Sequence, residues 1–167
     1  MEGTVAIVGY MGSGKTTVGR ALARTLRLEF VDLDRAIVKI AGKGIPEIFA
    51  EHGEERFRDM EHRALLDAIE GRTPNVIACG GGVVIREDNR ALLRDVTTVF
   101  LKEDTDVLYQ RTRGPGRPLR AASREEFERR YMDRLPFYLE VADAQVEVDG
   151  RSPSEVAEEV LACLSRR

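Results

Sequence analysis

A glycine-rich segment near the amino terminus carries the strongest chemical signal in this 167-residue chain. Residues 9–16 read Gly-Tyr-Met-Gly-Ser-Gly-Lys-Thr, which fits the pattern G-x-x-x-x-G-K-[ST], and they follow an apolar run typical of a buried strand. Glycines allow backbone N–H groups to converge on phosphate oxygens, and the start of a following helix adds a favourable dipole. The segment therefore predicts a P-loop that binds the phosphates of a nucleotide.

The residues of this loop have distinct expected roles in phosphoryl transfer. Lys15 supplies a positive charge to the β and γ phosphates, and the Thr16 hydroxyl binds Mg²⁺. A dinucleotide-binding fingerprint is excluded, because the glycine spacing is wrong and a lysine occupies the loop. The residues expected to contact the nucleotide here are Gly12, Ser13, Gly14, Lys15, Thr16 and Thr17.

Two carboxylates and a run of glycines follow later predicted strands. Asp32 and Asp34 lie at the carboxyl end of a strand, which is the usual ligand edge of an open parallel sheet. Aspartate also caps helices, so the residues alone leave Asp34 open between capping and chemistry. Another apolar strand ends in three consecutive glycines, residues 80–82, which favours a bound molecule close to the backbone.

Six elements occur in order along almost the whole chain. They are the loop 9–16, Asp32 with Asp34, Phe57-Arg58 in a helical segment, Gly80 to Gly82, Arg117-Pro118-Leu119 and Arg134-x-Pro136-x-Tyr138. The short arginine-containing segments carry no information individually. Together, in register with a five-stranded α/β pattern, the six elements resemble the shikimate kinase family.

The resemblance implies ATP-dependent phosphorylation of the 3-hydroxyl of shikimate. By the resemblance, the catalytic residues are Lys15, Asp34 and Arg117. The resemblance also implies a set of residues that bind shikimate, a ring with a carboxylate and three hydroxyls: Asp34, Arg58, Gly80, Gly81, Gly82 and Arg134. The chemistry is sensible, because arginine matches a carboxylate with two parallel hydrogen bonds and an aspartate can accept a hydroxyl proton.

On the nucleotide side, the resemblance implies two cofactors, ATP and Mg²⁺. Asp32 would hold the metal through water, together with Thr16. Arg111 would lie against adenine and Arg117 would reach the phosphates from a lid, although for Arg111 the residues themselves do not distinguish a ligand contact from a solvated charge. Arg151 is expected near adenine from its chain position alone.

Other functions fit the residues less well. A GTP-binding switch would contain Asn-Lys-x-Asp and Asp-x-x-Gly segments, which the sequence lacks. A domain that binds nucleotide only as a regulator would need neither Asp34 nor the lid arginine. Paired arginines with an aspartate fit a sugar acid almost as well as shikimate, so a P-loop kinase acting on a sugar acid such as gluconate, or on a nucleotide, remains an alternative.

The elements that must position these residues follow from hydrophobic patterning. Short β-branched runs alternate with helical periods, which predicts a P-loop NTPase-like three-layer fold, similar to nucleoside monophosphate kinases, with a five-stranded parallel sheet flanked by helices. The expected strands are Thr4 to Val8, Glu29 to Asp32, Asn75 to Cys79, Thr97 to Leu101 and Gln145 to Val148. We expect a single domain, 1–167, with a substrate-binding insertion at about 33–61 and a lid at about 113–124.

Composition excludes several classes of partner. A net charge of −3 and a pI near 5.6 argue against nucleic-acid binding. No apolar run approaches the roughly 18 residues needed to span a bilayer, and no secretory leader is recognisable, so we expect a cytoplasmic protein without a membrane partner. Cys79 and Cys163 are too few for a disulfide framework or a metal cluster. We expect a monomer.

Overall fold

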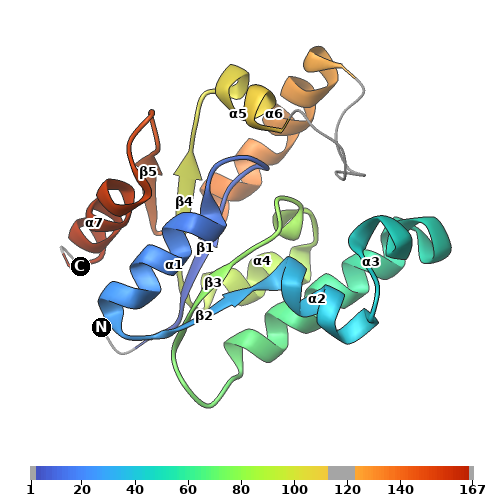
Figure 1. Ribbon diagram of the computed structural model, residues 1–167, viewed down its shortest axis with the longest axis horizontal. Helices are drawn as coiled ribbons and strands as arrows, with labels where there is room; N and C mark the ends of the chain where they lie inside the picture. Colours follow the sequence, from blue (N-terminus) through green and yellow to red (C-terminus); the bar gives the residue numbers. More distant parts are fainter. Residues whose placement is uncertain (1–2, 113–122, 166–167) are drawn as a thin grey trace.

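The computed structural model describes residues 3–112 and 123–165 of the chain (Figure 1). Within these residues, strands and helices alternate in the manner of βαβ units. In chain order the elements are β1 (Val5–Val8), α1 (Lys15–Leu26), β2 (Glu29–Asp32), α2 (Leu33–Ala41), α3 (Ile45–Ile69), β3 (Asn75–Ala78), η1 (Val83–Ile85), α4 (Glu87–Arg94), β4 (Thr97–Lys102), α5 (Thr105–Arg111), α6 (Arg124–Val141), β5 (Ala144–Glu147) and α7 (Pro153–Leu164).

The five strands form one parallel sheet in the order β2-β3-β1-β4-β5. Val5 of β1 lies opposite Val76 of β3 and Thr97 of β4, while Asp32 ends β2 opposite Ala78. The predicted strands and the predicted parallel sheet are confirmed, with strand ends within one or two residues of those expected. The carboxyl ends of β1, β2 and β3 therefore meet at one edge of the sheet, where they are followed by the P-loop, by Asp34 and by the glycine segment 80–82.

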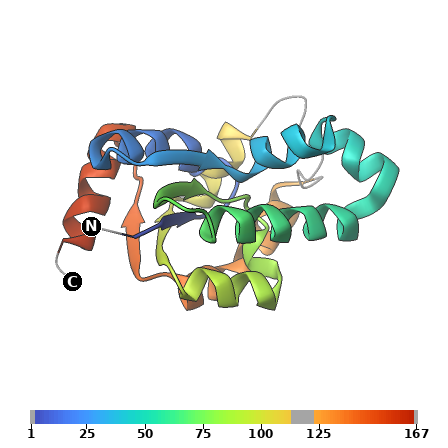
Figure 2. The same cartoon turned by 90° about the horizontal axis from the view of Figure 1, so that it is seen from below.

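Helices cover both faces of the sheet, which gives the predicted three layers (Figure 2). Successive side chains of a strand point to opposite faces. Val5 and Ile7 accordingly pack in one cluster with residues of α1 and α7, whereas Ala6 and Val8 pack in the other with residues of α3, α4 and α6. β1 is fully buried on both faces, so its end, where the P-loop begins, is fixed from both sides.

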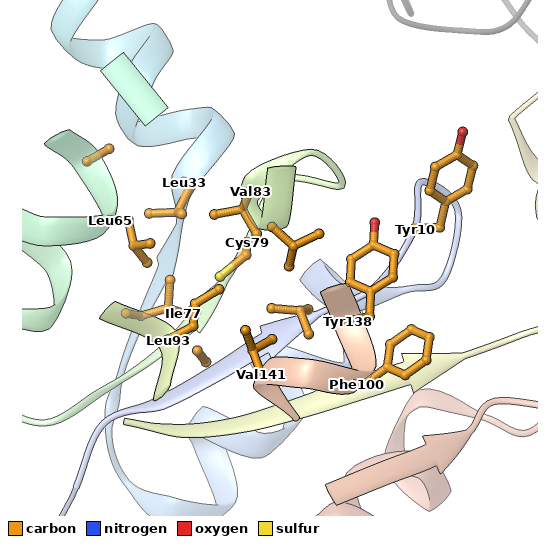
Figure 3. Packing of buried hydrophobic residues seen from close by; sticks show 14 of the residues in the cluster. Tyr10, Leu33, Leu65, Ile77, Cys79, Val83, Leu93, Phe100, Tyr138 and Val141 are labelled. Carbon is orange, nitrogen blue, oxygen red and sulfur yellow. The ribbon is translucent and has the colours of Figure 1, made fainter. Parts of the chain in front are cut away.

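The larger of the two clusters extends beneath the ligand edge of the sheet (Figure 3). Tyr138 of α6 stacks on Phe100 of β4, with ring centroids 5.0 Å apart. Cys79 is buried just after β3, and this burial raises the pKa of its thiol. A neutral buried thiol packs as a small hydrophobic side chain.

Two helices, α2 and α3, occupy the connection between β2 and β3, the part of the chain that contains the predicted insertion at about 33–61. α2 and the first part of α3 project to one side of the sheet (Figure 1). α3 is kinked at Gly53, whose φ of 76° lies in the left-handed region that glycine adopts readily. Beyond the kink, Phe57, Ala64 and Leu65 are buried and form the face of α3 that packs in the core.

The last helix begins as its sequence predicts. The Ser152 hydroxyl accepts a hydrogen bond from the Glu155 N–H, the Glu155 carboxylate accepts one from the Ser152 N–H, and Pro153 occupies the first helical position. Val156 and Val160 are buried against the sheet. None of the described helices, this one included, combines the length and the apolar character needed to cross a membrane.

Candidate active site

A cleft of about 480 Å³ lies where the ends of β1, β2 and β3 face the start of α1. Its walls come from the P-loop, α2, α3, the glycine segment after β3, α5 and α6. Most of the residues predicted for the site line it: Gly12, Gly14, Lys15, Thr16, Thr17, Asp34, Arg58, Gly80, Gly81, Gly82, Arg111 and Arg134. The fold thus brings together residues that are more than 100 positions apart in sequence.

The P-loop has the backbone conformation that phosphate binding requires. Gly12 and Gly14 both have φ of 86°, in the left-handed region, and α1 begins directly after Gly14. Lys15 reaches back over the loop and donates a hydrogen bond from Nζ to the Tyr10 carbonyl oxygen at 2.8 Å. Ser13 is fully buried beneath the loop. A positive side chain and the first N–H groups of a helix therefore converge on one point.

Asp32 links the P-loop to the end of β2. The Thr16 hydroxyl donates to Asp32 Oδ2 at 2.8 Å, and Asp32 Oδ1 accepts the N–H of Arg35 at 3.2 Å. Asp32 is therefore the residue that caps α2. Asp34 lies within the first turn of that helix, is exposed and lines the cleft, so of the two roles that the sequence left open for Asp34, helix capping is wrong.

The Thr16 and Asp32 oxygens have the character of a magnesium site. Mg²⁺ prefers oxygen ligands and usually keeps several waters, taking one or two carboxylates plus substrate phosphates. Among the described residues, no three His, Cys, Asp or Glu side chains gather as a metal cluster. A single carboxylate beside a hydroxyl at the phosphate position fits a metal that arrives with the nucleotide.

Arg58 is held by two carboxylates on its own helix. Its Nη1 donates to Glu61 Oε2 at 2.7 Å and its Nη2 donates to Glu54 Oε1 at 3.0 Å. Burial disfavours the charged guanidinium, but these two partners outweigh it and raise the pKa of Arg58. Burial also raises the pKa of Glu61, which is 1% exposed, against the opposing effect of Arg58. The guanidinium is thus charged and fixed in orientation.

The glycine segment after β3 makes room for these charges. A Cβ on Gly80 would lie 2.6 Å from Glu61 Oε1 and 3.2 Å from Asp34 Oδ1, and one on Gly82 would overlap the Arg58 guanidinium. The sequence predicted a bound molecule close to this backbone. The structure shows that the protein's own charged side chains already approach it closely, which is a second reason for glycine at these positions.

Arg134 approaches the same segment from α6. Its Nη1 donates to the Gly81 carbonyl oxygen at 3.3 Å, and its guanidinium lies 5.3 Å from the ring centroid of Tyr10. Tyr138, one turn further along α6, donates its hydroxyl hydrogen to the same carbonyl. Arg58, at Gly82, and Arg134, at Gly81, therefore both lie against the glycine segment and line one cleft, an arrangement suited to a carboxylate ligand.

The remaining predicted nucleotide contacts have different placements. Arg111 lines the cleft, where its Nη1 lies 3.3 Å from the Gly12 carbonyl oxygen and 3.2 Å from Glu103 Oε2. Arg151 pairs with Glu159 of α7 and is not among the described residues that line the cleft. Arg117, with residues 113–122 of the predicted lid, lies outside the described part of the chain.

The sequence reasoning missed Glu61, which lines the cleft, and two residues that contact lining residues, Tyr10 and Glu103. Glu61 was detectable, since a glutamate three residues after Arg58 on a helix is a neighbour that pairs with it. Tyr10 occupies a position that the P-loop pattern leaves unspecified, and Glu103 lies in no motif, so nothing local marked either residue. Both became visible through side-chain packing.

The geometry defines a class, the P-loop kinases that phosphorylate small molecules. A phosphate-binding loop, a carboxylate beside the expected phosphate position and two arginines share one cleft. The family model for shikimate kinase matches residues 11–165. This chain belongs to the shikimate kinase family.

Individual relatives agree with the family match over nearly their whole length. A shikimate kinase from Salinispora arenicola is 42% identical over 167 residues, covering 99% of each chain. One from Dictyoglomus turgidum is 38% identical and covers 96% of each chain. The lengths correspond, so no large part of these relatives lacks a counterpart here.

Solved structures show the same fold. A shikimate kinase from Acinetobacter baumannii in complex with shikimate superposes with a TM-score of 0.93 at 35% identity, covering 100% of this chain and 96% of that one. A gluconokinase from Sinorhizobium meliloti reaches a TM-score of 0.62 at 21% identity, covering 99% of this chain and 93% of that one. The second likeness concerns the fold alone. It gives no support to the gluconate alternative.

Proposed function

We propose that this protein transfers the γ-phosphoryl group of ATP to the 3-hydroxyl of shikimate. The observation that carries the proposal is the cleft in which the P-loop, Asp34 and the arginines Arg58 and Arg134 meet, in a chain of the shikimate kinase family. The relative from A. baumannii was solved with shikimate bound. A ring with one carboxylate and several hydroxyls matches a cleft that offers two guanidinium groups and a carboxylate.

On the nucleotide side, the P-loop N–H groups and Lys15 bind the β and γ phosphates of ATP. The Thr16 hydroxyl and, through water, Asp32 would hold Mg²⁺, which would supply positive charge beside the transferred group. Lys15 exchanges its hydrogen bond with the Tyr10 carbonyl for one with a phosphate oxygen. Arg111 flanks the nucleotide, while Arg117 and Arg151 remain predicted contacts.

On the acceptor side, Arg58 and Arg134 bind the carboxylate of shikimate. Glu61 and Glu54 hold Arg58 in place before the substrate arrives, which lowers the entropy lost on binding. The Gly80 to Gly82 backbone approaches the ring. These contacts orient the ring so that one hydroxyl faces the nucleotide.

Asp34 is the proposed general base. Asp34 lines the cleft together with the arginines and the P-loop, and the residue that caps α2 is Asp32. As phosphoryl transfer proceeds, Asp34 accepts the proton of the attacking hydroxyl, and Lys15 stabilises the charge that develops on the phosphoryl oxygens.

A coupled assay of ADP formation tests the proposal. Purified protein, ATP and Mg²⁺ would be supplied with shikimate, with gluconate and with nucleoside monophosphates in parallel. We expect turnover with shikimate alone, and loss of turnover when EDTA removes the metal. Comparable turnover with gluconate, or none with shikimate, would contradict the assignment.

We further propose that the enzyme acts as a cytoplasmic monomer. The P-loop, Asp34, Arg58 and Arg134 meet in one cleft within one fold, which supports a single chain as the active unit. Light scattering after size exclusion should give a mass near 18.7 kDa at micromolar concentration. A dimeric mass would contradict this part of the proposal.

A further inference from the structure

Tyr10 belongs to the P-loop, yet its side chain is part of the packing against α6. It is 1% exposed. Its ring meets Phe127 edge-on with centroids 4.9 Å apart and Tyr131 edge-on at 5.5 Å, both from α6. Figure 3 shows the Tyr10 ring on the loop that follows β1. The P-loop is therefore anchored to the helix that carries Arg134.

The guanidinium of Arg134 lies over the same Tyr10 ring. The Cζ atom of Arg134 lies 5.3 Å from the Tyr10 ring centroid, within the range of a cation–π interaction. On another side, Arg134 Nη1 donates to the Gly81 carbonyl oxygen. A guanidinium has five N–H donors, so an aromatic face and one carbonyl fix its plane while donors remain for a ligand carboxylate.

The backbone of Tyr10 contacts the machinery that binds nucleotide. Its carbonyl oxygen accepts hydrogen bonds from Lys15 Nζ at 2.8 Å and from the Ser13 N–H at 3.2 Å. The glycine segment also lies against this stretch, because a Cβ on Gly81 would come within 3.2 Å of the Met11 nitrogen. One residue thus touches the phosphate-binding lysine through its backbone and the carboxylate-binding arginine through its ring.

We propose that Tyr10 is a positioning residue that couples the nucleotide site to the carboxylate subsite of the acceptor. The proposal rests on the function proposed above, since it takes Arg134 as a ligand of the shikimate carboxylate. Nucleotide phosphates draw Lys15 away from the Tyr10 carbonyl and order the loop around themselves. The Tyr10 ring already packs on α6 beside Arg134 without nucleotide, and the nucleotide-bound loop makes this arrangement more stable, which keeps Arg134 oriented for the carboxylate. By linkage, bound shikimate must raise nucleotide affinity by the same factor.

Calorimetric titration measures this coupling directly. It needs no tryptophan fluorescence, and the chain contains no tryptophan. Shikimate would be titrated into the protein with and without a non-hydrolysable ATP analogue and Mg²⁺. We expect the analogue to increase shikimate affinity in the unmodified protein. Tyr10→Leu should weaken shikimate binding by roughly threefold to tenfold, as loss of a partly desolvated cation–π contact implies, and should shrink the enhancement. Tyr10→Phe keeps the ring face and should retain most of the enhancement of shikimate affinity by the analogue.

Two controls separate positioning from general packing. Tyr109→Leu makes the same substitution in a ring that packs on Phe127 from α5, at 5.3 Å, and should leave the enhancement in place. In an Arg134→Ala background, Tyr10→Leu should have little further effect on shikimate affinity, because two residues that act through one contact are not additive. If Tyr10→Leu lowers the melting temperature too far, Tyr10→Met, with a side chain that fills irregular gaps, replaces it.

The outcomes distinguish this proposal from the one on which it rests. An enhancement that is absent in the unmodified protein, or unchanged in the folded Tyr10→Leu variant, overturns the coupling role. The coupling role is also overturned if Tyr10→Leu weakens shikimate binding as strongly in the Arg134→Ala background as in the unmodified protein. Unchanged shikimate affinity in Arg134→Ala instead contradicts the proposed carboxylate contact, and the coupling proposal falls with it.

Discussion

The two halves of the cleft are built in different ways. The nucleotide half is mainly one continuous segment, residues 9–17, whose conformation follows from its own glycines and from the start of α1. The acceptor half takes Asp34 from α2, Arg58 from α3, Gly81 from the segment after β3 and Arg134 from α6. A local motif withstands sequence change elsewhere, whereas an assembled site depends on each element that presents it. Substitutions should therefore have effects of different kinds in the two halves.

The largest effect is expected in the nucleotide half. Lys15→Ala removes a charge that is needed most where charge develops during transfer, so kcat should fall by orders of magnitude. The melting temperature should hardly change, because the side chain lies over the loop and outside the two apolar clusters. Steady-state kinetics and thermal melting on one preparation test this. Near-normal turnover would remove the P-loop lysine from the mechanism.

Asp34→Asn tests the chemical residue of the acceptor half. The change keeps the shape but removes the basicity, so kcat should fall by about 10² or more, as is typical of a lost general base, while ATP affinity measured without shikimate stays within a few fold. Stability should be preserved because Asp32 caps α2.

The matched variant for Asp34→Asn is Asp32→Asn, which alters both the cap and the contact with Thr16. It should change the Mg²⁺ dependence of the rate. If Asp34→Asn turns over normally while folded and able to bind ATP, Asp34 is a structural residue.

Arg58→Ala should reveal how far the acceptor half depends on its internal charges. Loss of a shielded carboxylate contact should weaken shikimate binding by about 2 kcal/mol, with the KM for ATP little changed. The variant also leaves Glu61 buried without its arginine. Burial already raises the pKa of Glu61 above its ordinary 4.5, and the loss of Arg58 raises it further.

A raised folded-state pKa has a definite consequence for stability. The folded state then binds the Glu61 proton more tightly than the unfolded chain, so the stability this proton provides is present below about 4.5 and is lost as pH rises through the folded pKa. The melting temperature of Arg58→Ala should therefore fall over that range more steeply than that of the unmodified protein. In the double variant Arg58→Ala with Glu61→Gln, this extra pH dependence of the melting temperature should disappear. If the melting temperatures of Arg58→Ala and of the double variant change with pH in the same way, a buried, titrating Glu61 is contradicted.

The smallest effect is expected at Glu103, which reaches the nucleotide half through Arg111. Its buried carboxylate lies 3.2 Å from Arg111 Nη1, which also reaches the Gly12 carbonyl oxygen. The Arg111 side chain is 39% exposed, so solvent screens the pair and Glu103→Gln should raise the KM for ATP only about twofold to fivefold. The KM for shikimate should stay constant. Glu147→Gln, in an exposed pair with Lys102, is the control and should change neither constant.

The sequence by itself determined whatever depends on contiguous residues. The P-loop followed from its glycines and lysine, the strands from short apolar runs, and the start of α7 from its capping residues, because backbone conformation and local hydrogen bonding are set within a few positions. The resemblance to a family supplied the acceptor residues as a set. It did so without showing how Arg58 or Arg134 is held.

Only the tertiary structure decided which side chains meet. The strand order puts β3 beside β1, so the segment 80–82 lies against the P-loop. Packing then buries Glu61 against Arg58 and sets the Tyr10 ring against Arg134. Which aspartate caps the helix also depended on where α2 begins, because Asp32 is the cap residue and Asp34 lies in the first turn. These contacts join residues far apart in the chain, and their free energy comes from burial and charge pairing that exist only once the sheet and its helices have assembled.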